Sequence, residues 1–138
     1  MMNHSKAVLW TVFGLLGWAF VAPTPSYAGQ ADVVGVEARK SSDATYRFSV
    51  TVSHADTGWD HYADAWQVIG PDGAVLGERI LAHPHVNEQP FTRSLSGVGI
   101  PNGITSVTVR ARDLVHGFGG QEIAIDLPEK IGDVATAP

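Results

Sequence analysis

The chain has 138 residues, of which 44% are hydrophobic, with a formal net charge of −5 and no cysteine. This length accommodates one small domain and a leader, but not two domains with cores of their own. The acidic balance argues against nucleic acid or an anionic membrane surface as a partner, because both attract clustered Lys and Arg. Without cysteine, disulfides, thiolate catalysis and zinc–thiolate sites are excluded.

Residues 1–28 have the pattern of a cleavable secretory signal peptide. A short basic start leads into an apolar run over residues 7–22, which prolines end, and small residues at Ser26 and Ala28 stand where a signal peptidase reads the chain. We therefore predict cleavage after Ala28 and an exported mature chain, periplasmic or secreted. No cysteine near the junction is available for a lipid anchor. The apolar run is shorter than the roughly 20 residues of a spanning helix, so retention as a membrane tether is the less favoured alternative.

After this segment, apolar and polar side chains alternate with the period of two that indicates β-strands. The first strand is expected over residues 32–39. The second, over residues 46–54, has the clearest pattern, because Phe48, Val50 and Val52 share one face. This alternation predicts strands with one buried and one exposed face.

The third and fourth strands are expected over residues 62–69 and 74–81. The Gly-Pro-Asp-Gly sequence at 70–73 predicts a tight turn, so the two strands should form a hairpin. Trp66 and Val68 on the third strand are expected to lie in the core.

The remaining three strands are expected over residues 91–98, 106–113 and 121–127. Seven short strands in about 100 residues are typical of an immunoglobulin- or fibronectin-III-like antiparallel β-sandwich, which we place over residues 29–128. Residues 129–138 lack the alternation and are predicted to form a flexible C-terminal tail.

All five histidines after residue 28 lie at three predicted connections: His54 and His61 at the one between the second and third strands, His83 and His85 within residues 82–90, and His116 in the glycine-rich loop over residues 116–120. In such a sandwich the strands alternate in direction, so these connections meet at one end. We call this end the histidine pole. The turns at the opposite end contain no histidine. The clustering therefore marks the histidine pole as the candidate functional face.

Imidazole is a ligand for Cu(II) and Zn(II), so the cluster predicts a divalent metal site. His83 and His85 form an H-x-H pair, whose rings lie on the same side of an extended segment. A carboxylate near the cluster adds a ligand or orients a ring. The expected ligands are His61, His83, His85 and His116, supported by His54, Asp60 and Glu88.

Two other interpretations of the histidine pole remain open. The loops at one end of a rigid sandwich also suit the recognition of an exported protein or ligand without a metal. The aromatic contacts would then come from Trp59, Tyr62, Phe91 and Phe118. The histidines could also be exposed or hydrogen-bonded loop residues that titrate near pH 6.5. No catalytic motif is present, so we expect a binding protein rather than an enzyme.

Charged residues on inward-facing strand positions near this pole need partners, because burying an unpaired charge is costly. Arg93 shares the phase of Phe91, and Asp64 and Asp113 share the phase of core residues on their strands. We therefore predict a structural ion pair between Arg93 and either Asp64 or Asp113.

Overall fold

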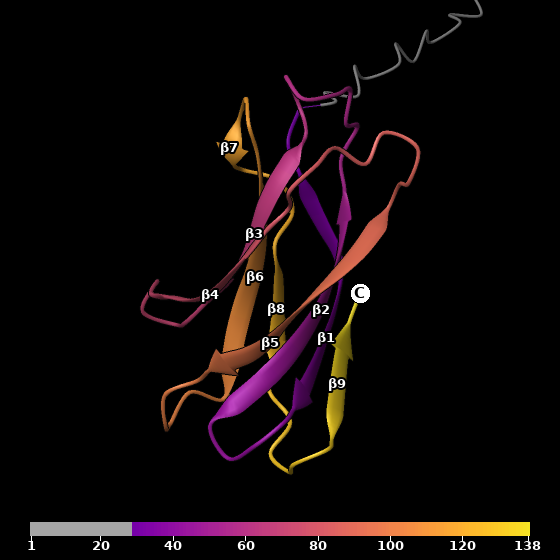
Figure 1. The fold of residues 1–138 in the computed structure, drawn as a ribbon. Coiled ribbons are helices and arrows are strands. Elements are labelled where there is room, and N and C mark those ends of the chain that lie inside the picture. Colours follow the sequence, from indigo (N-terminus) through magenta and orange to yellow (C-terminus); the bar gives the residue numbers. More distant parts are fainter. Residues whose placement is uncertain (1–28) are drawn as a thin grey trace, which may run out of the picture.

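Two antiparallel sheets lie face to face and enclose the core between them (Figure 1). The computed structural model describes residues 29–138, so the predicted signal peptide lies outside the described residues. One sheet has the strand order β5-β2-β1-β9. The other has the order β4-β3-β6, with β7 and β8 following one another along the free edge of β6. The strands are β1 (Asp32–Lys40), β2 (Thr45–Ser53), β3 (Ala63–Ile69), β4 (Val75–Ile80), β5 (Phe91–Gly99), β6 (Ser106–Asp113), β7 (Gly117–Phe118), β8 (Ile123–Asp126) and β9 (Val134–Ala137).

The expected all-β class is confirmed, since the described residues contain nine strands and no α-helix. Strands β1 to β6 and β8 coincide with the seven expected strands. The number differs from seven because the glycine-rich loop contributes the short strand β7 and the C-terminal residues contribute β9. Within residues 29–138, no helix is long and apolar enough to cross a membrane.

The alternation along the central strands decides which side chains enter the core. On β2 the buried side chains are Tyr46, Phe48, Val50 and Val52. On β6 the same period buries Val107, Val109, Ala111 and, at the end of the strand, Asp113. Trp66 on β3 is fully buried between the sheets. Full burial of each large apolar side chain contributes about 1.5–3 kcal/mol, so this pattern fixes the register of both sheets.

Residues 129–138, expected as a flexible tail, carry β9 instead. This strand pairs antiparallel with β1 from Val36↔Ala137 to Arg39↔Val134. The turn before β9 is joined to the end of β1 by two hydrogen bonds. The Gly132 N–H donates to the Lys40 carbonyl (2.9 Å), and the Lys40 N–H donates to the Asp133 carbonyl (3.1 Å). The edge of β1 offers unpaired backbone groups, and β9 satisfies them although its own apolar pattern is weak.

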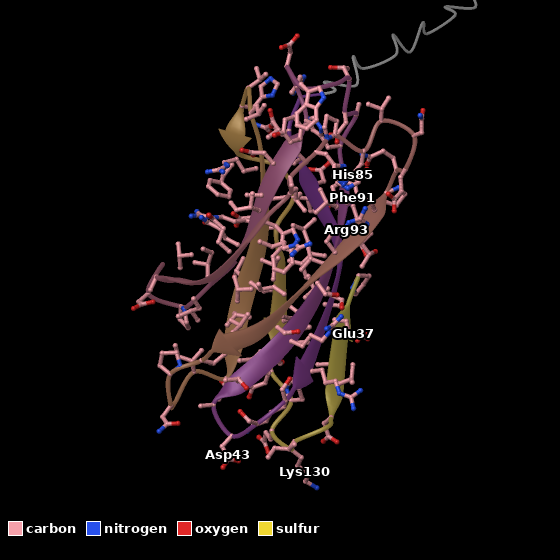
Figure 2. The ribbon with its side chains drawn as sticks, viewed as in Figure 1. Glu37, Asp43, His85, Phe91, Arg93 and Lys130 are labelled. Carbon is pink, nitrogen blue, oxygen red and sulfur yellow. The ribbon has the colours of Figure 1, made fainter. Side chains whose placement is uncertain are left out.

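The three histidine-bearing connections meet at one end of the molecule, beside β7 in Figure 1. In Figure 2, His85 and Phe91 lie toward this end, whereas Asp43 and Lys130 lie at the other. The histidine pole that the sequence predicts is therefore present in the folded chain.

Candidate metal centre

Three imidazole rings, from two different loops, are in contact at the histidine pole. His54 follows β2, His61 precedes β3, and His116 lies in the turn between β6 and β7. The ring centroids of His54 and His61 are 4.8 Å apart, and those of His61 and His116 are 5.2 Å apart. The predicted convergence of the first and third loops thus brings their rings within reach of each other.

The buried carboxylate of Asp56 fixes the ring of His54. Its Oδ1 atom lies 2.5 Å from Nδ1 of His54 and accepts a hydrogen bond from the Ala63 N–H (2.9 Å), while Oδ2 accepts one from the His85 N–H (2.7 Å). Both the Asp56 and the His54 side chains are fully buried. An ionised carboxylate only accepts hydrogen bonds, so Nδ1 of His54 carries the proton and donates it.

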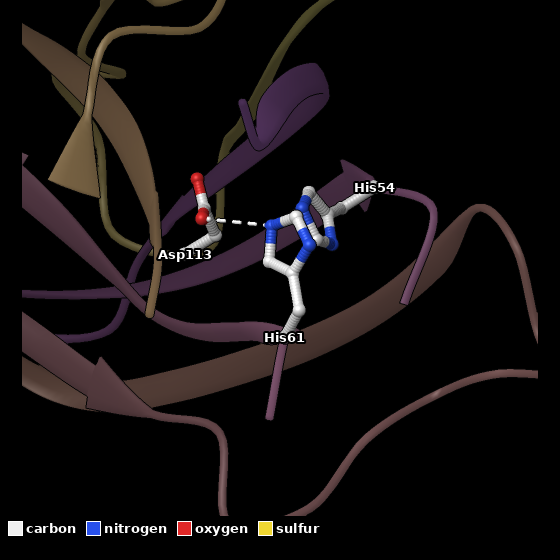
Figure 3. Close-up of side chains that lie close together, drawn as sticks. All are labelled: His54, His61 and Asp113. Carbon is white, nitrogen blue, oxygen red and sulfur yellow. Dashed lines mark hydrogen bonds and ion pairs between the residues drawn. The ribbon is translucent and has the colours of Figure 1, made fainter. Parts of the chain in front are cut away.

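The other ring nitrogen of His54, Nε2, therefore presents a lone pair. It is buried and has no hydrogen-bond partner among the described residues. Leaving a buried polar atom without a partner costs about 1–3 kcal/mol, so such an atom calls for an explanation. Figure 3 shows this ring beside His61, with Asp113 on the other side of His61.

Asp113 is the second buried carboxylate of the pole and is 1% exposed. Its Oδ1 atom accepts backbone hydrogen bonds from Val115 (2.9 Å) and His116 (2.8 Å). The same atom lies 3.0 Å from Nδ1 of His116 and 3.1 Å from Nε2 of His61. Its Oδ2 atom is buried and has no partner within residues 29–138. Asp113 thus joins two histidines and keeps one oxygen free.

The hydrogen bonds of Asp113 also decide its charge. Burial by itself would raise the pKa of this carboxyl, but the N–H groups of His116 and Val115 and the His116 ring together lower the pKa below its ordinary value. Asp113 is therefore ionised at neutral pH, as a metal ligand must be.

His54, His61 and Asp113 each offer one ligand atom, and these atoms all lie within 4.8 Å of one another. We call these residues the trio. Nitrogen and oxygen ligands bind Zn(II) at about 2.0–2.2 Å, which places tetrahedral ligands about 3.4 Å apart. Nε2 of His61 and Oδ1 of Asp113, 3.1 Å apart, meet this spacing, while the limit of 4.8 Å for the whole trio exceeds it by about 1.4 Å. The His61 side chain is 21% exposed, so its ring has room to complete the approach.

The H-x-H pair of the sequence lies apart from the trio. The rings of His83 and His85 are neighbours, with centroids 4.6 Å apart, as the extended spacing predicts. The buried ring of His85 stacks on Phe91 at 3.9 Å, and its Nδ1 atom lies 4.0 Å from Oδ2 of Asp56. His83 is exposed, and its Nδ1 atom donates to the Pro84 carbonyl (3.1 Å). The structure does not bring these two rings together with His61 and His116.

Burial and the nearby Arg93 guanidinium hold the pKa of His85 below its ordinary value of 6.5. Both of its ring nitrogens are buried without a hydrogen-bond partner in the described part of the chain. His85 is therefore a neutral ring held by packing, and its hydrogen bond to Asp56 comes from the backbone N–H.

The two carboxylates proposed to support the ligands are exposed. Asp60 lies in the turn before His61, on the solvent side. Glu88 forms an ion pair with Arg93, with 3.1 Å between Oε2 and Nη2. The supporting carboxylates are instead Asp56 and Asp113.

The predicted ion pair of Arg93 with Asp64 or Asp113 is wrong. Arg93 pairs with Glu88, and Arg112 pairs with Asp64 at 3.1 Å. A β-bulge between Ala63 and Ala65 explains the difference, because it shifts the register of β3 on β6 and turns Asp64 toward the outward-facing Arg112. The sequence alternation, which assumes a regular strand, placed Asp64 on the wrong face.

The four aromatic residues proposed as contacts also separate. Trp59 is 67% exposed and packs edge-on against Tyr62, with centroids 5.8 Å apart. Phe91 is buried beneath His85. Phe118 is covered by the guanidinium of Arg110, 4.1 Å from the ring centroid. Of the four, Trp59 is the side chain that projects furthest into solvent.

The pairing of the histidines with the two buried carboxylates was not predicted from the sequence, although Asp113 was expected near this pole as a partner of Arg93. Asp56 stands two residues after His54 in the same loop, and Asp113 ends an inward-facing strand phase. For Asp113 the sequence did contain the necessary information, because an acidic residue at an inward-facing strand position beside histidines predicts a polar partner.

Comparisons with known proteins give one relative. A protein of Halomicrobium mukohataei named "Putative lipoprotein" is 44% identical over 97 residues, which cover 70% of this chain and 47% of the relative. The chain therefore spans about half the length of this curated relative. No known family model matches the chain, and no solved structure matches it. The protein is thus described by its own structure: two facing antiparallel sheets with a cluster of histidines and carboxylates at one end.

Proposed function

We propose that this protein is an exported binding domain that takes up a divalent transition metal, Cu(II) or Zn(II), at the trio. The observation that carries the proposal is the Nε2 atom of His54, whose lone pair is buried without a partner in residues 29–138 while Nδ1 is held by Asp56. A bound cation would remove the cost of that unpaired nitrogen. A ring that donates Nδ1–H to a carboxylate and keeps Nε2 free is the usual arrangement of a metal-binding histidine.

The donor set supports a first-row divalent ion. Two imidazole nitrogens and one carboxylate oxygen suit Zn(II) and Cu(II). The same donors suit Fe(II), which the Irving–Williams order places below both. Asp56 would orient His54, and His116 would hold Asp113 through the hydrogen bonds to Oδ1. Positions beyond the three protein ligands would be taken by water or by a further ligand, so we propose binding rather than catalysis.

Two observations support export. Residues 1–28 have the order of a secretory signal peptide. The relative from Halomicrobium mukohataei is named a lipoprotein, a name that belongs to the cell envelope. We carry over only this location, periplasmic or secreted. We also propose an immunoglobulin- or fibronectin-III-like sandwich, on the order β5-β2-β1 in one sheet and β4-β3-β6-β8 in the other.

A titration of metal-stripped protein with Cu(II) and with Zn(II) tests the metal proposal. We expect a single site of sub-micromolar affinity, weakened at least tenfold in His61→Ala. The matched control is His83→Ala, which removes an exposed imidazole of the same pole that lies outside the trio. Binding no tighter than that of an isolated surface histidine, or equal losses in the two variants, would remove the proposal.

A metal-free recognition module remains the second candidate, and a specific observation favours it. Large apolar side chains are exposed around the pole, namely Trp59 (67%), Val115 (60%), Val86 (51%) and Leu114 (48%). Exposed apolar groups gathered on one face are a feature of protein contact surfaces. The partner would be another exported protein. A protein that binds no metal in the titration would leave this candidate in place.

A further inference from the structure

Gly29, the first described residue, lies buried at the histidine pole against His116. A Cβ atom built on Gly29 would come within 3.1 Å of both Cε1 and Nε2 of the His116 ring. A backbone nitrogen lies about 2.5 Å from the Cβ position of its own residue, so the Gly29 nitrogen is within about 6 Å of Nε2. The other nitrogen of the same ring, Nδ1, contacts Asp113. His116 therefore stands between the trio and the start of the described chain.

The glycine-rich loop explains how the chain reaches this position. A Cβ on Gly119 would lie 2.5 Å from the Gln30 side chain, and a Cβ on Gly120 would lie 2.1 Å from the Ala31 carbonyl. Real Cβ contacts are not that short. The Gln30 amide can move aside, but the Ala31 backbone cannot, so glycine is needed at position 120 for this segment to pack here.

Backbone hydrogen bonds fix the same segment further along. The Gln121 N–H donates to Oδ1 of Asp32 (2.7 Å), and the Val33 N–H donates to the Gln121 carbonyl (2.9 Å). Ala31, two residues after Gly29, is fully buried. Residues 29–33 therefore pack on and hydrogen-bond to residues 119–121. These contacts, made by the residues that follow Gly29, hold Gly29 against His116.

The predicted cleavage site is the bond between Ala28 and Gly29. Hydrolysis adds one water across this bond and leaves a carboxylate on Ala28 and an α-amino group on Gly29. Before cleavage the Gly29 nitrogen belongs to a peptide bond, whose lone pair is delocalised into the carbonyl. After cleavage it is an amine, which gives up a proton and offers a lone pair at a pH near 8 or, with a metal present, lower.

We propose that the α-amino nitrogen of Gly29 and Nε2 of His116 form a pair of nitrogen ligands for Cu(II), so that removal of residues 1–28 completes the metal site. Amine and imidazole nitrogens suit the tetragonal geometry of Cu(II). The pair adjoins the trio, because the His116 and His61 rings are 5.2 Å apart and His116 Nδ1 contacts Asp113. The inference rests on the metal-binding function proposed above and makes copper uptake depend on processing of the chain.

The test compares two forms of residues 29–138, which contain both sheets and the whole core. One form begins with the free amine of Gly29, and the other is acetylated selectively at that amine. Cu(II) affinity is measured by competition with a chelator, and nitrogen coordination by electron paramagnetic resonance. We expect the free form to bind at least tenfold more tightly and to show one more coordinated nitrogen. Thermal unfolding of the metal-free forms checks that acetylation leaves the fold intact.

His116→Ala in both forms is the matched control, since it keeps the amine and removes the imidazole that faces it. The advantage of the free form should disappear in this variant. An advantage that survives His116→Ala would belong to a generic terminal amine and would overturn the inference. Equal affinities of the free and acetylated forms would also overturn it and leave the trio standing. No binding by either form would end both proposals.

Discussion

The two groups of histidines at the same pole differ in what holds their rings. In the trio, each imidazole contacts a buried carboxylate, with 2.5 Å between His54 and Asp56 and 3.1 Å between His61 and Asp113. In the H-x-H pair, the ring of His85 is held by stacking on Phe91, and its nearest carboxylate oxygen is 4.0 Å away. Histidines gathered at one end of a fold therefore do not by themselves make a metal site. A carboxylate that fixes one nitrogen is what turns the other toward a cation.

Removing the carboxylate of Asp56 should have the largest effect, because this group holds the His54 ring. Asp56→Ala leaves the His54 ring and the backbone N–H groups of Ala63 and His85 without their acceptor. We expect a loss of about 3–4 kcal/mol in the free energy of unfolding, because several buried donors lose a charged partner. Chemical denaturation measures it.

Asp60→Ala is the control for that prediction, since Asp60 is an exposed carboxylate of the same loop. It should change the free energy of unfolding by less than about 0.5 kcal/mol. Similar losses in the two variants would mean that Asp56 does not organise the pole.

Metal protection against unfolding separates the trio from the H-x-H pair. A cation at 100 times its dissociation constant should stabilise the fold by about 2.7 kcal/mol, because it binds the folded state. His61→Ala should reduce this stabilisation by about half or more, because a tenfold weaker site gives only about 1.4 kcal/mol at the same ion concentration. His85→Phe should retain it in full, since the His85 ring lies outside the trio. Thermal unfolding with and without the ion, reversed by a chelator, measures the effect. Protection that is undiminished in His61→Ala would place the ion elsewhere.

The pH dependence of stability should report His85 in particular. Burial and Arg93 lower the pKa of His85 in the folded state below 6.5. As the pH falls through 6.5, the unfolded chain takes up a proton at this residue before the folded chain does. The free energy of unfolding should therefore decrease from pH 7 to pH 5. This decrease should be smaller than the stabilisation that a bound metal ion provides.

The variant His85→Phe should flatten that slope, and denaturation curves across this range test it. Asp113 does not contribute to this slope. Its pKa is lowered in the folded state, so the stability that it adds is lost only as the pH falls below about 3.8, its ordinary pKa. A slope unchanged in His85→Phe would show that other groups cause it.

The smallest effect is expected from Glu88, a carboxylate of the same pole that is paired at the surface. Glu88→Gln removes an ion pair with Arg93 whose side chains are 57% and 29% exposed. Exposed pairs contribute about 0–1 kcal/mol, so we expect a change in unfolding free energy of under about 0.5 kcal/mol. Metal affinity should stay the same in the titration. A large loss of affinity would bring Glu88 back as a ligand.

Much of the fold follows from local pattern. The alternation of Phe48, Val50 and Val52 gives the buried face of β2, and the turn at residues 70–73 gives the hairpin of β3 and β4. Strand β9 could not be predicted in the same way, because Val-Ala-Thr-Ala carries little apolar signal. Its partner is the open edge of β1, which exists only after the sheet has formed.

Strand periodicity and loop positions were enough to predict an all-β chain after residue 28 with its histidines in three connections at one end. Which of those histidines share a carboxylate became visible only in the folded chain. The bulge at Asp64 turns that side chain to the other face of the sheet, and the His85 ring stacks on Phe91. Both arrangements depend on contacts that form only when the chain folds. Strand periodicity arises from local backbone geometry, whereas ligand geometry needs side chains from separate loops to be fixed within about half an ångström.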